Sequence, residues 1–222
     1  MMQSNILWKT VVTLILAAVL GAASADDEIG NWTANFALGY QHWGAVSDLD
    51  TEPLGTFDEG GWNAVGSVKR RWREIGRSDL LFGMDLGFMS NDSDIRAPGD
   101  LGEVAADVWF LTPSITWSVS GRRSKRLNLE AGAGLYWTEI KEFWNTGYGL
   151  AEGTEYFEEI APGGYLGISA DFSVPYGEKA WAFNIAARVH YADFGKVVAF
   201  GRDLGDLDGP ITTLQVGLTY DW

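Results

Sequence analysis

Apolar and polar residues alternate along most of the chain with a period of two, which is typical of β-strands that show different surroundings on their two faces. Eight stretches carry this alternation over about nine residues or more, the length that a tilted strand needs to cross a bilayer core. The expected strands are residues 32–40, 62–72, 80–88, 109–119, 127–137, 165–174, 181–191 and 213–222. The pattern predicts an all-β chain.

The links between these strands alternate in length. Short links are expected at residues 73–79, 120–126 and 175–180, and long ones at 43–61, 90–105, 139–162 and 192–210. All short links then fall on one side of the sheet and all long ones on the other, as in transmembrane barrels, whose turns are short on one side and whose loops are long on the other. We therefore expect an eight-stranded antiparallel up-and-down transmembrane β-barrel.

The two faces of the expected strands differ in bulk. One face carries Trp, Phe, Leu and Tyr at most positions, and the other carries Gly, Ala, Ser, Thr and Asn with scattered charges. An eight-stranded barrel has an interior only just wide enough for side chains to fill it. The bulky face is therefore expected to point outward into lipid, which argues against the rival interpretation, a soluble barrel of the lipocalin type with an apolar interior. The reverse orientation would also expose Asp85, Glu130, Asp171 and Arg188 to lipid, at about 2–4 kcal/mol for an arginine near the midplane.

Aromatic residues gather at the ends of the apolar face, where amphipathic rings favour the two membrane–water interfaces. The expected aromatic girdle consists of Trp32, Tyr40, Trp62, Trp109, Trp137, Trp181 and Tyr191.

The composition excludes several classes of protein. The net charge is −14, which argues against nucleic-acid binding, since phosphates require a basic surface. No cysteine is present, so neither a disulfide framework nor a thiolate metal site is available. We find no phosphate-binding loop, nucleophile elbow or metal-ligand pair, and expect no cofactor and no metal.

The N-terminal segment has the features of a cleaved export signal. Lys9 precedes an apolar run at residues 11–22, and small residues at 23–25 form a cleavage pattern before Asp26. We expect residues 1–25 to be a signal peptide, cleaved near Ala25, and residues 26–222 to form the barrel domain.

The export signal, the eight alternating strands and the C-terminal sequence LQVGLTYDW (214–222) resemble the small outer-membrane β-barrel superfamily of Gram-negative bacteria, which includes the OmpA transmembrane domain, OmpW and the opacity proteins. The last strand of that group ends in an aromatic residue, usually Phe, preceded by alternating hydrophobic residues, and the outer-membrane assembly machinery reads it. The resemblance implies location in the cell outer membrane, contact with its lipid and lipopolysaccharide, and an assembly signal formed by Leu214, Val216, Leu218, Tyr220 and Trp222.

Polar residues on the opposite face are expected to line the lumen, where buried charges must be paired. This lumen polar network is expected to include Lys69, Asp85, Glu130, Tyr136, Tyr165, Asp171, Arg188, His190 and Gln215. Ion pairs of Arg188 with Glu130 or Asp85 fit the pattern.

The leading hypothesis is an outer-membrane barrel with a structural or surface-interaction role and no catalysis, whose long acidic loops face the medium. A narrow channel for small solutes is the alternative. A third hypothesis is a lipid A-modifying enzyme that uses His190: the sequence there resembles lipid A deacylases, whose strand histidine precedes a nucleophilic serine by two positions. Ala192 occupies that position here, so the expected nucleophile is missing.

Overall fold

The computed structural model describes residues 32–47, 49, 59–76, 78–95, 102–119, 125–145, 150–174, 181–199 and 202–222. The expected signal peptide and the start of the expected barrel domain lie outside this part of the chain. Among the described residues, no helix has the length and hydropathy of a transmembrane helix.

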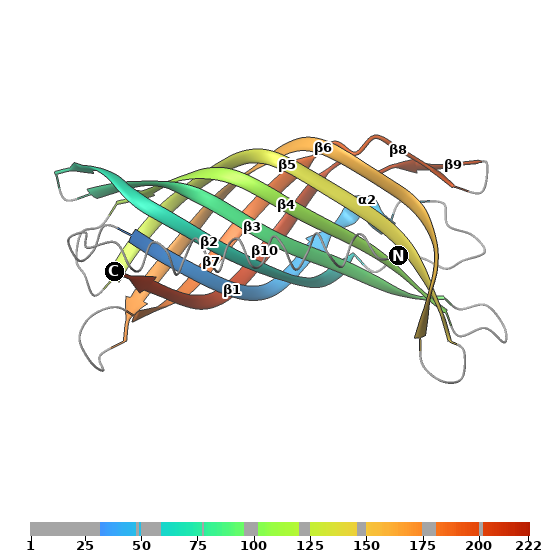
Figure 1. Cartoon of the computed structure of the whole chain (residues 1–222), viewed down its shortest axis with the longest axis horizontal. Helices are drawn as coiled ribbons and strands as arrows, with labels where there is room; N and C mark the ends of the chain where they lie inside the picture. The colour runs from blue at the N-terminus through green and yellow to red at the C-terminus, as the bar shows by residue number, and fades with distance from the viewer. Residues whose placement is uncertain are drawn as a thin grey trace.

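Eight long strands form one closed antiparallel barrel (Figure 1). They are β1 (Trp32–Trp43), β2 (Gly60–Ile75), β3 (Ser78–Ile95), β4 (Gly102–Ser118), β5 (Lys125–Asn145), β6 (Leu150–Ser173), β7 (Trp181–Ala192) and β10 (Pro210–Asp221). Strands that follow one another along the chain pair, and β10 closes the barrel on β1. The short helix α2 (Gly44–Ser47) follows β1, and the hairpin of β8 (Lys196–Ala199) and β9 (Arg202–Asp206) lies between β7 and β10. This confirms the predicted number, order and pairing of the barrel strands.

Both ends of the described chain lie at one end of the barrel. Trp32 and Trp222 exchange two backbone hydrogen bonds of 3.0 Å, which complete the β1–β10 pair there. We call this the terminal end, and the opposite end, which carries α2, β8 and β9, the far end.

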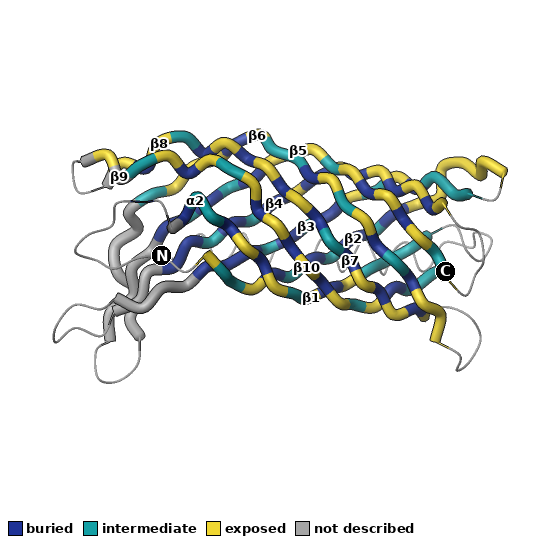
Figure 2. The backbone as a smooth tube through the Cα atoms, turned by 180° about the vertical axis from the view of Figure 1, so that it is seen from behind, coloured by how far each residue is buried: buried dark blue, intermediate teal, exposed yellow. Residues whose placement is uncertain are grey.

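The outer surface of the barrel is apolar. Side chains alternate between buried and exposed along each strand, which Figure 2 shows as alternating colours along the tube. Phe36 in the middle of β1 is 59% exposed and Leu166 on β6 is 71% exposed. Similar residues face outward on all eight strands, and only lipid can cover so continuous an apolar surface. The barrel is therefore a transmembrane one.

Three of the expected loops contain additional strand. Residues 90–105 were expected to form a loop, but β3 runs to Ile95 and β4 begins at Gly102. Residues 139–162 were expected to form another, but β5 extends to Asn145 and β6 begins at Leu150. The expected loop 192–210 contains the β8–β9 hairpin. Apolar and polar residues do not alternate with a period of two in these added segments, so the pattern on which the expectation rested is absent there.

Candidate functional site: the barrel lumen

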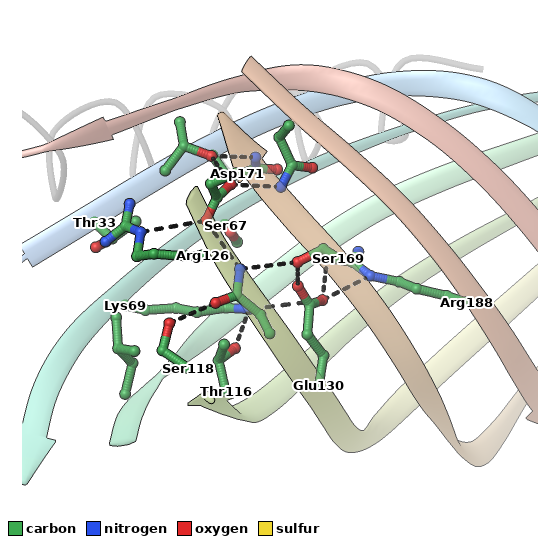
Figure 3. A pocket seen from close by; sticks show the side chains of 15 residues that line it. Thr33, Ser67, Lys69, Thr116, Ser118, Arg126, Glu130, Ser169, Asp171 and Arg188 are labelled. Atoms are coloured by element: carbon green, nitrogen blue, oxygen red, sulfur yellow. Dashed lines mark hydrogen bonds and ion pairs between the residues drawn. The ribbon is translucent and has the colours of Figure 1, made fainter. Parts of the chain in front are cut away.

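The terminal half of the lumen is a polar pocket. It has a volume of about 40 Å³, enough for a few water molecules, and its lining includes charged residues of β2, β5, β6 and β7 (Figure 3). Those charged residues are Lys69, Arg126, Glu130, Asp171 and Arg188. The alternation of each strand points them inward, and the small Ser and Thr residues between them leave the space that they occupy.

Glu130 is the centre of a buried ion-pair network. Its Oε2 accepts hydrogen bonds from Arg188 Nη2 at 2.7 Å and Arg188 Nε at 3.0 Å, and its Oε1 accepts one from Ser169 Oγ at 2.6 Å. Lys69 Nζ lies 4.0 Å from Glu130 Oε2 and 3.7 Å from Asp85 Oδ1. Tyr165 OH donates to Asp85 Oδ2. Two cations therefore face two carboxylates, as burial of charge requires.

A second network surrounds Asp171 nearer the terminal end. Its carboxylate accepts hydrogen bonds from Asn128 Nδ2 at 2.9 Å, Asn184 Nδ2 at 2.7 Å and Thr219 Oγ1 at 3.0 Å. Arg126 lies 3.6 Å from Asp171 and reaches Asp221 at 2.6 Å. These contacts join β5, β6, β7 and β10 across the interior.

His190 lies where the polar half of the lumen ends. It is fully buried, and its Nδ1 is 3.0 Å from Tyr136 OH. The rings of Phe110 and Tyr165 have centroids 4.9 Å and 5.2 Å from its own. Gly132 allows this packing, because a Cβ there would come within 2.4 Å of the Tyr165 ring.

The far half of the lumen is filled by an apolar cluster that we call the apolar plug. It includes inward-facing side chains of the barrel strands, such as Val65, Met89 and Phe110. It also includes Trp43, Val46 and Leu49 from the segment around α2, and Phe194, Val197 and Leu207 from the segment around β8 and β9. We expected small and polar residues along the whole lumen, which is wrong for this half. Residues from links fold back into the barrel there, and their position depends on the closed barrel.

Beside the plug, four buried amide side chains of β1, β2, β3 and β10 form a layer on the inner face of the barrel wall. Gln41 Nε2 donates to Asn91 Oδ1, and Gln215 Nε2 donates to Asn63 Oδ1 at 2.7 Å. Of these four residues, only Gln215 was expected to line the lumen; Gln41, Asn63 and Asn91 were not. Asn63 continues the inward alternation within its expected strand, while Gln41 and Asn91 continue it just past the ends of theirs.

All nine residues of the expected lumen polar network are buried inside the barrel. Arg188 pairs with Glu130, whereas Asp85 pairs with Lys69 and Tyr165. The expected girdle residues lie on the outer surface. Phe88 connects Trp62 and Trp109 with ring centroids 5.0 Å and 4.2 Å apart, and Trp109 and Trp137 are 6.2 Å apart.

Leu214, Val216, Leu218 and Tyr220 of the expected assembly signal lie on β10, and Trp222 directly follows it. Leu214, Val216 and Leu218 are exposed on the outer surface of the barrel. At the terminal end of that strand, Tyr220 packs against Trp181 and Trp222, with centroids 4.8 Å and 5.6 Å apart. Recognition of this strand during assembly stays a prediction.

The surroundings of His190 bear on the hypothesis of a catalytic lumen. Within the described residues, no group of three or more His, Asp and Glu could hold a metal ion. A histidine base activates a hydroxyl nucleophile that lies beside it, but the hydroxyl beside His190 belongs to the tyrosine Tyr136. His190 Nε2 has no hydrogen-bond partner among the described residues.

The closed eight-stranded barrel, its apolar outer belt and its filled lumen define the class of protein: a small transmembrane β-barrel with the fold of outer-membrane proteins. No protein-family model matches the chain, and no curated protein matches it.

Several solved barrels are similar to it. The attachment invasion locus protein of Yersinia pestis is 13% identical, with 86% of this chain and 99% of that chain covered and a TM-score of 0.44. The outer membrane protease OmpT from Escherichia coli is 8% identical, with 86% and 97% covered and a TM-score of 0.45. OprG from Pseudomonas aeruginosa is 11% identical, with 88% and 97% covered and a TM-score of 0.40. The class of this chain rests on its own barrel.

Proposed function

We propose that this chain is a bacterial outer-membrane protein whose lumen does not conduct, and whose role is structural or based on contacts that its far end makes with the medium. The apolar plug carries this proposal. It occupies the far half of the lumen, and the cavity of about 40 Å³ in the terminal half holds only a few waters.

Reconstitution in planar bilayers tests the closed lumen. The folded protein is expected to give no lasting single-channel conductance and no swelling of liposomes in small sugars or amino acids. Empty liposomes and liposomes with a known porin provide the two reference values. Stable conductance steps that become more frequent as the protein concentration rises would overturn the proposal and favour a narrow channel.

The channel alternative has one observation in its favour. Polar groups continue past the ion-pair network on the side of β1, β2 and β10, where Gln41, Asn63 and Gln215 form the amide layer. A conducting route would have to follow this wall. In that case Gln215→Leu would lower the conductance, whereas Leu214→Val, one residue along and on the outer surface, would leave it unchanged.

Absence of catalysis is the second part of the proposal. His190 is buried among three aromatic rings, and the hydroxyl at its Nδ1 is held on a buried tyrosine. We expect lipid A from cells that express the protein to have an unchanged mass spectrum. A new lipid A species that disappears in His190→Ala would establish the enzyme hypothesis instead.

Export and assembly complete the proposal. Cleavage near Ala25 would leave a mature chain that begins at Asp26, which N-terminal sequencing or intact mass measures directly. The mature protein would fractionate with the outer membrane and contact its lipid and lipopolysaccharide. An N-terminus at Met1 in that fraction would contradict the cleavage.

A further inference from the structure

The positive charges of this acidic chain are unevenly distributed. Nine of the 16 lysines and arginines lie within residues 69–77 and 122–126, with Glu74 as the one acidic residue of these two stretches. The described residues of these stretches, 69–76 and 125–126, lie at the terminal end, where β2 ends and β5 begins. β3 pairs with β4, and Ser78 Oγ donates to Val119 O at 3.3 Å, so the two hairpins are neighbours.

Some of these cations belong to the lumen and others to the outer surface. Lys69 and Arg126 are held in the buried ion pairs. Arg71 is exposed and lies 3.4 Å from Asp79. Arg70, Arg73 and Lys125 are exposed. In contrast, exposed charged residues of the described far end are mostly acidic, as at Glu158, Glu159 and Asp208, and Lys196 there is paired with Asp203.

The exposed cations lie at the expected depth of a membrane interface. Trp62 and Trp72 are both exposed on β2, ten residues apart, which for a strand tilted by about 40° corresponds to about 25 Å, the height of the apolar band of such barrels. Arg70 is two residues from Trp72, and its guanidinium lies 5.5 Å from the centre of the Trp32 ring. This is the level at which phospholipid phosphates meet the hydrocarbon.

Exposed apolar residues accompany the cations. Trp72 is 71% exposed and Ile75 is 52% exposed, on a hairpin that extends past its neighbours at the terminal end (Figure 1). The pairing of β2 with β3 shifts register between Arg71 and Arg73, and Trp72, which lies at this bulge, has no paired residue on β3. An aromatic ring beside arginines suits a surface that is apolar on one side and anionic on the other.

We propose that the outward-facing surface of β2–β5 at the terminal end binds the headgroups of anionic phospholipids, through Arg70, Arg73 and Lys125, with Trp72 inserted among the acyl chains. A planar guanidinium forms paired hydrogen bonds with phosphate. These cations face sideways from the barrel wall, where lipid rather than a soluble polyanion adjoins the protein. The far end, which is acidic, offers no such surface in its described part.

Lipid selectivity of the folded protein tests this proposal. The protein is reconstituted in phosphatidylcholine vesicles with trace spin-labelled phosphatidylglycerol or phosphatidylcholine, and the fraction of immobilised label is compared. We expect phosphatidylglycerol to be preferred about fivefold, the ratio for one lysine or arginine at an anionic surface. The preference should fall at 1 M salt, where the screening length is about 3 Å. If the wild-type protein had equal affinity for both lipids at low salt, that result alone would overturn the proposal.

Charge-neutral variants locate the surface. Arg70→Gln, Arg73→Gln and Lys125→Gln together should abolish the preference, whereas arginine-to-lysine changes at 70 and 73 should retain most of it. The matched control is Lys141→Gln, Lys196→Gln and Arg202→Gln, which removes three cations from the far end. Equal loss in the control, or retention in the first variant, would contradict the assignment. If the first triple variant lost binding to a soluble polyanion but kept the lipid preference, the cations would serve a different partner. That result would also overturn the proposal.

Discussion

Glycines on the inner face determine how closely the lumen rings can pack. A Cβ at Gly132 would come within 2.4 Å of the Tyr165 ring, whose hydroxyl is held by Asp85. A Cβ at Gly66, in contrast, would meet nothing within 4 Å. The same residue type therefore has different physical roles on the two faces of the wall.

Gly132→Ala is expected to destabilise the barrel by about 1–3 kcal/mol, since the Tyr165 ring must move against its hydrogen bond. Gly66→Ala is the matched control and is expected to leave stability unchanged or raise it by about 0.4–1 kcal/mol. Urea unfolding of the protein in lipid vesicles measures both. Equal effects of the two substitutions would refute this interpretation of the lumen packing.

The buried ion pair of Glu130 and Arg188 also contributes to stability through single side chains. Glu130→Gln leaves Arg188 buried without its carboxylate, which is expected to cost about 3–5 kcal/mol of unfolding free energy. Arg188→Met combined with Glu130→Gln should cost less than Glu130→Gln alone, because no uncompensated charge from this pair remains. The same unfolding assay gives both values. A double variant less stable than the single one would contradict the pairing.

At the scale of elements, the β8–β9 hairpin is attached to the barrel by apolar contacts. Phe194, Val197 and Leu207 reach into the apolar plug, while Lys196 Nζ and Asp203 Oδ2 form an exposed pair at 2.8 Å. The hydrogen bond from Lys196 lowers the pKa of the Asp203 carboxyl. β8 lies beside β6 at the far end (Figure 1). Burial at the base of the hairpin, rather than its exposed ion pair, is expected to hold it in place.

Leu207→Ala is expected to release the hairpin, with a local cost of about 2–5 kcal/mol. Hydrogen exchange of residues 194–207 should become faster while β7 and β10 keep their protection. Lys196→Gln serves as the control, and little change is expected because the pair is exposed. Global loss of protection in Leu207→Ala would mean that the plug supports the whole barrel.

At the scale of the whole molecule, stability depends on contact between the apolar outer belt of the barrel and the hydrocarbon core of the bilayer. Phe36 lies four residues from both Trp32 and Tyr40 along β1, in the middle of the belt, and is 59% exposed. Phe36→Arg is expected to destabilise the folded barrel by about 2–4 kcal/mol, whereas Phe36→Leu should change it little. Unfolding in vesicles checks this difference. A tolerated arginine would place Phe36 in water.

Closure of the barrel depends on the last strand. β10 pairs with both β1 and β7, and Trp222 and Trp32 exchange hydrogen bonds at the seam. Deletion of Tyr220–Trp222 is expected to reduce the amount of folded protein in the outer membrane, detected as loss of the band whose mobility changes on boiling. Trp222→Phe, which keeps an aromatic residue at this position, should assemble normally. Normal levels after the deletion would contradict an assembly role for this segment.

The alternation of side chains was sufficient to predict the barrel. Each strand position faces either lipid or lumen, and this binary choice depends on local periodicity and on the bulk that a narrow interior accepts. The eight strands, their order and the inward direction of residues such as Glu130, Arg188 and His190 could therefore be predicted from the sequence.

The filling of the far half of the lumen was decided only by the tertiary structure. Val46, Leu49, Phe194 and Leu207 belong to links without strand periodicity, and they meet only after the barrel has closed around them. The partners of each lumen charge depend in the same way on the register between strands that lie far apart in the sequence, as for Lys69 beside Asp85 and Glu130. Periodicity determines the face on which a side chain lies, whereas contacts across the barrel depend on closure and register, which no single stretch of sequence contains.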